Sequence, residues 1–129
     1  MARTYIAYCF APIQGFSKFG SYKGNGSTNG PMIYTGFRPA FVIFKKSDGA
    51  ADWQVVDDKR LGYNPDQNYF NANEGFAEQT GDIIDLVSNG FKIRGDDSNG
   101  WNKDGGTYIY MAFAKAPFVN SEGVPCNAR

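Results

Sequence analysis

The chain has 129 residues, of which 13 are basic and 13 acidic, so its formal net charge is zero, and it contains no histidine. That length allows one domain with a sizeable core, and the lack of a basic stripe argues against nucleic acid as a partner. The lack of histidine excludes Ser-His and Cys-His catalytic dyads and removes the commonest metal ligand, so no metal or cofactor is expected.

The composition is rich in glycine and in aromatic residues. Sixteen glycines predict many tight turns, and an aromatic share of 16% favours strands. No apolar run approaches the roughly 20 residues of a membrane span, and the start, Met1 to Thr4, lacks the apolar core of a signal peptide. We therefore expect a protein that is assembled in the cytoplasm without membrane insertion.

The first predicted strand, Thr4 to Ala11, repeats the last one, Thr107 to Ala114, with five of the eight aligned residues identical. A repeated strand of this kind is typical of a module from a tandem array and indicates an assembly component. Both faces of the first strand are apolar or aromatic, so we expect it to be buried on both sides or to meet a neighbour. Cys9 within it is expected to be a buried free thiol, and a disulfide with Cys126 has only the count of two cysteines in its favour.

The next segment, Gln14 to Pro31, is rich in glycine and contains the turn dipeptides Asn25-Gly26 and Asn29-Gly30. We interpret it as a packed surface loop or short hairpin, because no following helix supplies the lysine and hydroxyl of a phosphate-binding loop. Alternation and turn residues then predict three more strands. These are Met32 to Thr35, Ala40 to Lys45 and Trp53 to Asp57.

Residues Leu61 to Thr80 are the least regular part of the chain. Asparagine, aspartate and proline between residues 64 and 73 predict a long loop. Four aromatic residues are expected to anchor it on the body: Tyr63, Tyr69, Phe70 and Phe76. A short helix from Glu74 to Gln79 is also predicted.

The segment from Asp82 to Arg94 carries the clearest local signal, that of a β-hairpin. Asn89-Gly90 suits the two central positions of a type I′ turn, which would pair Asp85 directly with Arg94. The same register gives the hairpin one apolar face, formed by Ile84, Leu86, Phe91 and Ile93. It therefore satisfies both the apolar face and a charge pair, although an exposed pair contributes only about 0.2–1 kcal/mol.

A polar loop, Gly95 to Gly106, holds the first candidate ligand site. Residues 96–100, Asp-Asp-Ser-Asn-Gly, match a calcium loop only in part, because no glutamate closes it, so a solvated turn is the simpler interpretation. Trp101 follows directly, and an exposed tryptophan beside Asp97 and Asn99 is suited to stack on a sugar ring. Trp53 is a second candidate of this kind, and the alternative is that each tryptophan caps the core or an oligomer contact.

Two pairs of adjacent carboxylates, Asp57-Asp58 and Asp96-Asp97, raise the hypothesis of a glycan hydrolase. Such an enzyme needs two carboxyl groups about 5–10 Å apart in a cleft. Neighbours along a strand point to opposite faces, so neither pair is a natural acid–base couple. No catalytic residue is predicted.

Many short strands separated by Gly and Asn turns, without a helix of convincing length, predict an all-β fold. The expected architecture is an antiparallel β-sandwich of jelly-roll type. We expect one such module over residues 1–118, in which residues 1–13 hold the strand that repeats residues 107–114. A C-terminal tail follows over residues 119–129.

Several longer runs, taken together, resemble those of a known family. They are Tyr5 to Pro12, Phe16 to Tyr22, Tyr34 to Pro39, Leu86 to Ile93, and Thr107 to Ala114 with Pro117-Phe118. Over roughly residues 4–118 the chain resembles a largely uncharacterised module of tailed-bacteriophage tail-fibre and virion structural proteins. The resemblance implies a non-enzymatic virion component and brings no catalytic residues. Such modules typically end a larger protein, so this chain is either a compact stand-alone version or a fragment.

Two functions follow as hypotheses. The first is a virion structural protein, in a tail fibre, a tail or a surface decoration, that associates with copies of itself and with other virion proteins. Its expected assembly contacts are Tyr5, Tyr8 and Phe10. The second is a carbohydrate-binding, receptor-recognition module of a phage tail, with a host surface glycan as partner. Its expected site is formed by Trp101, Trp53, Asn99 and Asp97.

Overall fold

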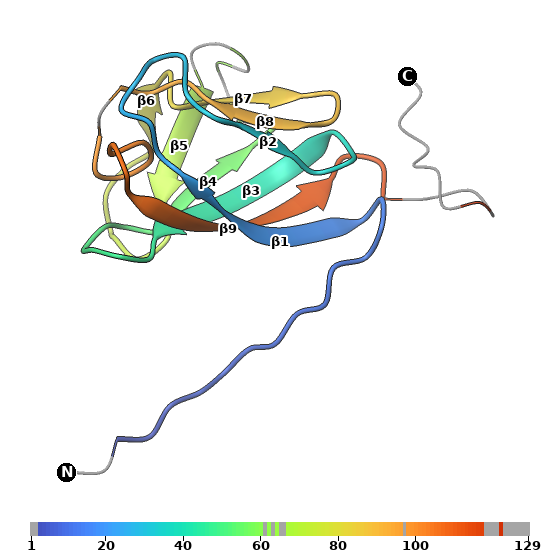
Figure 1. Ribbon diagram of the computed structural model, residues 1–129, viewed down its shortest axis with the longest axis horizontal. Helices are drawn as coiled ribbons and strands as arrows, with labels where there is room; N and C mark the ends of the chain where they lie inside the picture. Colours follow the sequence, from blue (N-terminus) through green and yellow to red (C-terminus); the bar gives the residue numbers. More distant parts are fainter. Residues whose placement is uncertain are drawn as a thin grey trace.

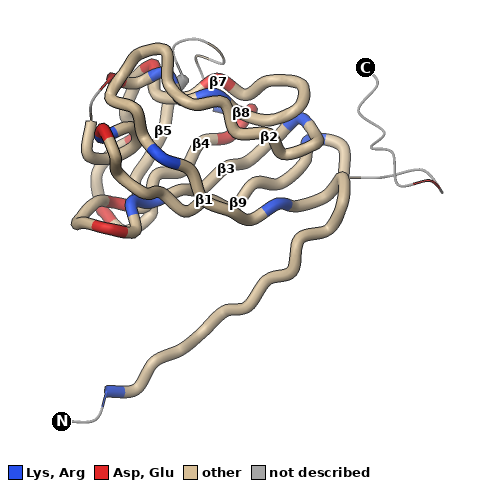
Figure 2. Tube along the Cα trace, in the orientation of Figure 1, with Lys and Arg blue, Asp and Glu red and all other residues tan. Residues whose placement is uncertain are grey.

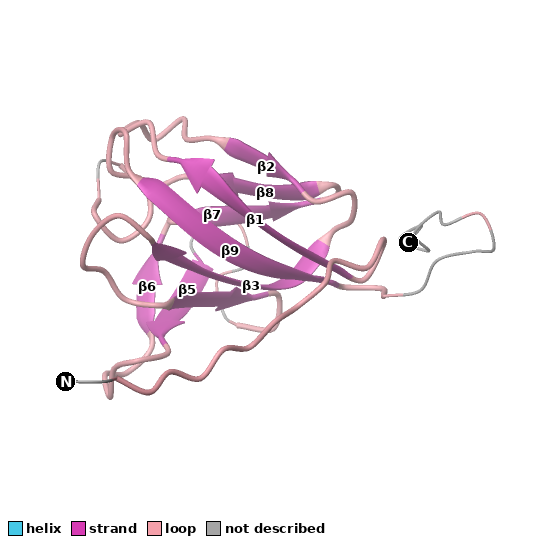
Figure 3. Cartoon of the chain, turned by 60° about the horizontal axis from the view of Figure 1, so that its bottom comes forward, coloured by secondary structure: helices cyan, strands magenta, loops and turns pink. Residues whose placement is uncertain are grey.

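Two antiparallel sheets pack face to face in the computed structural model, which describes residues 3–60, 62, 64, 67–96, 98–117 and 122 (Figure 1). The larger sheet has six strands in the order β1-β9-β3-β4-β5-β6, and the smaller has three in the order β2-β8-β7. No helix occurs in these described residues, and Figure 3 shows strands and loops alone. The predicted all-β antiparallel sandwich is confirmed.

Nine strands make up the described part of the chain. They are β1 (Ser17–Lys23), β2 (Met32–Tyr34), β3 (Pro39–Lys46), β4 (Gln54–Asp57), β5 (Gln67–Asn71), β6 (Gln79–Gly81), β7 (Ile84–Val87), β8 (Gly90–Ile93) and β9 (Thr107–Ala114). The predicted closing strand is confirmed with its bounds, and the strands predicted from residues 32, 40 and 53 are confirmed to within one residue at each end. The predicted tail, 119–129, lies outside the described residues apart from residue 122, and Cys126 and its possible disulfide lie outside them too.

The core lies between the sheets and is built from aromatic and branched aliphatic side chains. The larger sheet contributes Tyr22, Val42, Phe44, Val56, Tyr108, Tyr110 and Ala112, and the smaller contributes Ile33, Ile84, Leu86, Phe91 and Ile93. At its centre the rings of Tyr22 on β1 and Tyr108 on β9 stack with centroids 4.9 Å apart. Burying a large apolar side chain stabilises a fold by about 1.5–3 kcal/mol relative to leaving it exposed, so this layer holds the two sheets together.

Strands β7 and β8 form the predicted hairpin, and its predicted apolar face is confirmed. The four residues of that face, Ile84, Leu86, Phe91 and Ile93, are 0–1% exposed. The predicted register is wrong by two residues, because Asp85 pairs with Lys92 and the loop is Ser88-Asn89. Neither loop residue has the positive φ that a type I′ turn requires. A shift of two residues keeps every side chain on its face, which is why the face was predictable although the turn was not.

Close packing at Gly90 explains the shifted register. Gly90 pairs with Tyr34 of β2, and a Cβ at Gly90 would lie 2.0 Å from the carbonyl oxygen of Ile33. The glycine is therefore needed where two strands approach each other rather than in the turn. The predicted charge pair persists across a diagonal, with Arg94 Nε 3.3 Å from Asp85 Oδ2.

A strand, β1, occupies part of the segment that was expected to be a loop or a short hairpin. All seven of its residues pair with β9. Gly20 suggested a turn, but it lies in mid-strand because a Cβ there would lie 2.9 Å from the hydroxyl oxygen of Tyr110. The expectation of a loop is wrong because the glycine makes room for a neighbouring ring.

The long loop predicted over residues 61–80 contains β5 and β6, and the helix predicted from Glu74 to Gln79 is wrong. Pairing of β5 with β4 overrides the asparagine-rich local composition. Tyr69 anchors the segment as predicted, since it is 8% exposed, and Phe70 is half-buried, whereas Phe76 is 73% exposed. Tyr63 lies outside the described residues.

Candidate functional site

The segment before β1, residues 3–12, runs away from the body as an extended trace (Figure 1), and we call it the N-terminal arm. Four of its large side chains are exposed: Tyr5 by 80%, Ile6 and Tyr8 by 81%, and Phe10 by 59%. The strand predicted here is therefore wrong within a single chain, and so is the burial of Cys9, which is exposed. Both predictions assumed a pairing partner, and the described part of the chain provides none.

The arm is joined to β1 by a tight turn. Ile13 and Ser17 exchange two backbone hydrogen bonds, in which Ile13 N–H donates to Ser17 O at 3.1 Å and Ser17 N–H donates to Ile13 O at 2.9 Å. Gly15 within the turn has a φ of 70°, a conformation that glycine adopts without strain. Pro12 precedes the turn and biases Ala11 toward an extended backbone, so the arm leaves the turn as a straight segment.

Apart from Arg3 at its start, the arm carries no charge (Figure 2). It is thus a run of uncharged, largely apolar residues from Thr4 to Pro12 held in water. Contiguous exposed apolar surface on a soluble protein is typical of an interaction site.

The outer face of the larger sheet, which faces away from the core, is also apolar. Because Tyr108 and Tyr110 point into the core, alternation turns Ile109, Met111 and Phe113 of β9 outward. Strand pairing places further apolar side chains beside them, namely Phe19 on β1, Phe41 and Ile43 on β3, and Val55 on β4. The outer face of a sandwich is commonly solvated and polar, so this face is suited to contact another surface.

Aromatic contacts organise the part of the outer face that is nearest the arm. The Phe113 ring meets those of Phe16, Phe19 and Phe41 at centroid distances of 6.2, 6.0 and 6.0 Å. The pairs with Phe16 and Phe19 are edge-to-face and the pair with Phe41 is tilted, and aromatic pairs contribute about 0.5–1.5 kcal/mol beyond their buried area. These rings therefore form a fixed apolar platform at the base of the arm.

A pocket of about 580 Å³ lies between the arm and the outer face. Its side-chain lining is mainly Tyr8, Phe10, Phe19, Trp53, Ile109 and Met111. The Phe10 ring stacks on Phe19 with centroids 5.4 Å apart. The structure thus brings together two predicted assembly residues, Tyr8 and Phe10, with a predicted ligand residue, Trp53, whereas Tyr5 lies farther along the arm.

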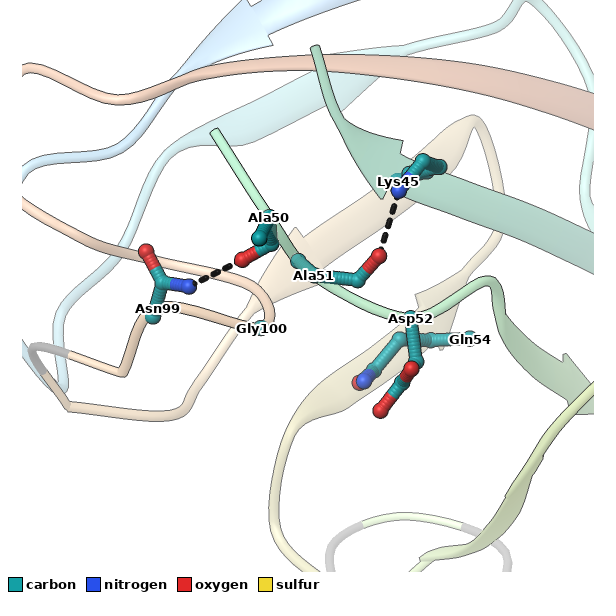
Figure 4. A pocket seen from close by; sticks show the side chains of 7 residues that line it. All are labelled: Lys45, Ala50, Ala51, Asp52, Gln54, Asn99 and Gly100. Carbon is teal, nitrogen blue, oxygen red and sulfur yellow. Dashed lines mark hydrogen bonds between the residues drawn. The ribbon is translucent and has the colours of Figure 1, made fainter. Parts of the chain in front are cut away.

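A second pocket, of about 530 Å³, is polar and holds the predicted residue Asn99 (Figure 4). The side chain of Asn99 donates to the carbonyl oxygen of Ala50 at 2.6 Å, and Lys45 Nζ donates to that of Ala51. Lys45 Nζ also lies 6.0 Å from the ring centroid of Trp53, so a residue that lines the polar pocket contacts a residue that lines the apolar one.

A chain of amides backs the polar pocket. Asn71 Nδ2 donates to Asp52 Oδ2 at 3.0 Å, and Gln54 Nε2 donates to Asn71 Oδ1 at 3.4 Å. Because a carboxylate only accepts, this chain fixes the orientation of both amides. Gln54 is 4% exposed, and its Oε1 has no hydrogen-bond partner among the described residues. Most polar groups here hold the loop before β4 in place.

Trp101 lies apart from Trp53 and packs on the core. It is half-buried, its ring meets Tyr69 edge-on at 5.9 Å, and a Cβ at Gly95 would lie 1.7 Å from its Nε1. Trp101 therefore fits the alternative given from the sequence, in which a tryptophan caps the core instead of stacking on a sugar. It borders a third pocket of about 350 Å³ that also contains Asp96, and the predicted ligand residue Asp97 lies outside the described residues.

Several carboxylates of the described residues are engaged in separate, structural contacts. Asp57 Oδ2 lies 2.8 Å from Arg60 Nε, and Asp58 Oδ2 lies 2.9 Å from Lys115 Nζ. Burial raises the pKa of Asp85, although Arg94 opposes the shift, whereas the backbone N–H of Thr107 lowers the pKa of Asp48. No group of three or more histidine, cysteine, aspartate or glutamate residues with metal-binding proximity occurs in the described part of the chain.

The same described residues include no helix long and apolar enough to span a membrane.

The outer-face residues Phe19, Ile109 and Met111 were not singled out from the sequence as functional. The signal was present, because the strand predicted at Thr107 to Ala114 is apolar on both faces. A strand that is apolar on both sides needs a second surface to cover it.

Comparison with known families matches residues 1–117 to a family model described as Domain of unknown function (DUF7483). The matched range includes both the N-terminal arm and β9. No curated protein matches the chain, and no solved structure matches it.

Proposed function

The chain belongs to the DUF7483 family, and we propose that it is a non-enzymatic structural protein of a bacteriophage virion that acts through self-association. The observation that carries the proposal is the N-terminal arm, with Tyr5, Ile6, Tyr8 and Phe10 exposed by 59–81%. Full burial of each such side chain is worth about 1.5–3 kcal/mol, and a partner that covers the arm would gain this contribution.

The outer face of the larger sheet supports the same role. It places Phe19, Ile109 and Met111 next to the arm, so arm and face form one continuous apolar surface. Net charge does not oppose contact between copies, since the chain carries 13 basic and 13 acidic residues. The virion assignment rests on the long motifs that resemble tail-fibre and virion structural proteins, and it includes a tail fibre, a tail or a surface decoration.

Self-association is tested by light scattering coupled to size exclusion, and by sedimentation, over a range of concentrations. The double variant Tyr8→Ser/Phe10→Ser should shift the chain from oligomer to monomer while its circular dichroism is unchanged. Phe76→Ser is the matched control, because Phe76 is 73% exposed but lies outside the arm. A wild-type chain that stays monomeric at every concentration would overturn the proposal.

The virion part of the proposal needs a separate experiment. Quantitative mass spectrometry of purified virions from an infection in which this polypeptide is made should detect it as a stoichiometric component. A few copies per particle would place it in the tail, and hundreds would place it in the shell. Absence from purified particles would remove the virion assignment.

A carbohydrate-binding, receptor-recognition role is the second candidate, and Trp53 favours it. This half-buried tryptophan lines the apolar pocket, and Lys45 Nζ of the polar pocket lies 6.0 Å from its ring centroid. Such a ring is suited to stack on one face of a sugar while nearby polar groups bond its hydroxyls. Binding to a panel of host surface glycans should then be lost in Trp53→Ala and retained in Trp101→Ala. Binding that survives Trp53→Ala would exclude this site.

A further inference from the structure

Strand β1 presents an open hydrogen-bonding edge. Ser17 bonds through both its N–H and its C=O to Ile13, on the side away from β9, whereas Gly24 bonds to Gly105 and Gly106 on the β9 side. Because backbone groups alternate in direction along a strand, the N–H and C=O groups of Phe19, Ser21 and Lys23 also point away from β9. Within the described residues, no strand lies beyond β1 in the sheet order.

Within the described residues, β1 is the longest of the four edge strands of the two sheets. Strand β1 has seven residues, whereas β2 and β6 have three each and β7 has four. The edge of β7 is covered by Asn64, whose side chain both donates to Leu86 O at 2.9 Å and accepts from Leu86 N–H at 3.0 Å. Proteins usually shorten or cover open edges in this way, and β1 is the exception in this fold.

The N-terminal arm has the properties of a strand without a partner. It is extended, exposed and free of charge from Thr4 to Pro12, and it has the sequence of β9 at five of eight positions. Strand β9 is the strand that already pairs with β1 on its other edge. A segment with these residue types is therefore suited to pair with a β-strand edge.

We propose that the N-terminal arm of one copy adds as an antiparallel strand to the open edge of β1 in a second copy, so that the larger sheet continues from subunit to subunit. The inference rests on the self-association proposed above and identifies its contact. The occupant is a second copy because the arm makes one pair of bonds at Ile13 and Ser17 and then diverges from its own β1 (Figures 1 and 3). Pro12, at this point of divergence, keeps the arm straight.

The proposed register is the one that would continue the intrachain pair of Ile13 with Ser17. Continuing the pairing of Ile13 with Ser17 sets Ala11 opposite Phe19, Cys9 opposite Ser21 and Ala7 opposite Lys23. Ala7, Cys9 and Ala11 alternate along the arm with its large residues. In this register the large residues point to the same side of the sheet as Tyr22 of β1. Those large residues are Ile6, Tyr8 and Phe10.

The face that receives the large residues has apolar surface to offer. Tyr34 and Met32 on β2 are 62% and 46% exposed, and Lys18 of β1 lies over the Tyr34 ring at 5.5 Å, which places β2 next to this edge. Phe10 would come opposite Gly20, where β1 has no side chain. The alternation of small and large residues in the arm thus matches the open side of the sandwich.

Cys9 makes the register testable by a disulfide between two different chains. The first chain keeps Cys9 and carries Cys126→Ser, and the second carries Cys9→Ser, Cys126→Ser and Ser21→Cys. Cα atoms directly opposite in an antiparallel pair lie about 4.5–5.5 Å apart, within the range that a disulfide spans. Mild oxidation of the mixture should give the mixed disulfide as its main product, read by mass spectrometry. The matched control replaces Ser21→Cys by Thr80→Cys, which is exposed on β6 at the opposite edge of the same sheet.

Two outcomes of this experiment would overturn the inference. One is equal cross-linking at positions 21 and 80, which would mean random collision. The other comes from a single chain that carries both Cys9 and Ser21→Cys on the Cys126→Ser background. If that chain forms its disulfide within monomers, the arm closes on its own β1.

A second measurement avoids cysteine chemistry. Ser21→Pro removes one N–H from the open edge but none that bonds to β9, so the fold should persist, as edge strands tolerate proline at such positions. Self-association should weaken about tenfold in Ser21→Pro, the effect of one lost hydrogen bond, and stay unchanged in Ser21→Ala. If the wild-type chain self-associates but Ser21→Pro does so equally well, the inference fails while the proposed function stands. A monomeric wild-type chain would remove both.

Discussion

The ring of Phe10 in the N-terminal arm stacks on the ring of Phe19 in β1, with centroids 5.4 Å apart and planes inclined by 23°. Phe19 in turn meets Phe113 of β9 edge-on at 6.0 Å. The arm therefore touches the body at an aromatic platform that belongs to the sheet itself. We expect the platform ring Phe113 to stabilise the fold, and Phe10 of the arm to be available to a partner.

Phe113→Ala should lower the free energy of unfolding by about 1–3 kcal/mol, because the partly buried side chain packs on three other rings of the platform. Phe10→Ala should lower it by less than about 1 kcal/mol, because Phe10 is 59% exposed. Urea titrations of both variants at a concentration where the chain is monomeric measure the difference. Equal losses would show that the arm is part of the folding unit.

A single glycine should decide whether the smaller sheet forms. Gly90→Ala would place a Cβ 2.0 Å from the carbonyl oxygen of Ile33, so β2 and β8 must separate, at a cost of several kcal/mol. Gly75→Ala is the matched control, because a Cβ there meets nothing within 4 Å and its effect should stay within about 0.5 kcal/mol. Thermal unfolding followed by circular dichroism compares the two. An unchanged melting temperature for Gly90→Ala would contradict the close packing of β2 on β8.

The sequence predicted the parts of the fold in which side-chain alternation is unbroken. Phe91 and Ile93 alternate with polar neighbours, and their burial and strand were predictable whatever the turn. Gly20 breaks the side-chain alternation of β1. A glycine is needed there because the ring of Tyr110, 90 residues later in the sequence, packs against it. Long-range packing of this kind leaves no local pattern, so the strand was missed.

The candidate site was predicted less fully, for a different physical reason. Tyr8 and Phe10 were predicted to lie in a strand, but they lie in the extended arm outside any strand and are 81% and 59% exposed. Whether such residues are buried depends on whether a partner strand is present. A sequence specifies pairing preference, not the identity of the partner. The sequence does not distinguish Trp53 from Trp101. The fold places Trp53 near Lys45 at the edge of the apolar pocket, whereas it packs Trp101 on Tyr69 of the core.

Two aspartates should change the pH dependence of stability in opposite directions. Burial raises the pKa of Asp85 above its ordinary value of 3.8, so the carboxylate is less favourable in the folded state than in the unfolded chain. Its destabilising effect is absent below that ordinary value, grows as the pH rises from there to the raised folded pKa, and is complete above the folded pKa. Asp85→Asn should therefore raise the free energy of unfolding at pH 7, and the gain should vanish near pH 3.

Asp48 is the matched comparison, because the Thr107 N–H at 2.8 Å lowers its pKa below 3.8. Its contribution is present above the ordinary pKa and is lost as the pH falls through the folded value. Asp48→Asn should lower stability at pH 7, and this loss should vanish in acid. Urea midpoints between pH 2.5 and 7 measure both variants, and shifts of the same sign would contradict the two environments.

Asn64 should protect the edge of β7 as well as stabilise it. Its side chain makes two hydrogen bonds to the backbone of Leu86, and its φ of 30° lies in the left-handed region, which asparagine and glycine tolerate best. Asn64→Gly keeps the backbone conformation accessible but removes both bonds, so it isolates their effect. The free energy of unfolding should fall by about 1–3 kcal/mol, as expected when two backbone groups lose their partners.

The same variant should also associate in a new way, because the edge of β7 would be open. Light scattering during prolonged incubation should rise in Asn64→Gly, and the rise should persist when Tyr8→Ser/Phe10→Ser is added, since the second edge does not depend on the arm. Asn64→Asp is the control that keeps an acceptor for the Leu86 N–H and adds a charge at the edge. If scattering in Asn64→Gly disappears with the arm substitutions, β7 needs no protection and β1 is the edge through which copies of this chain meet.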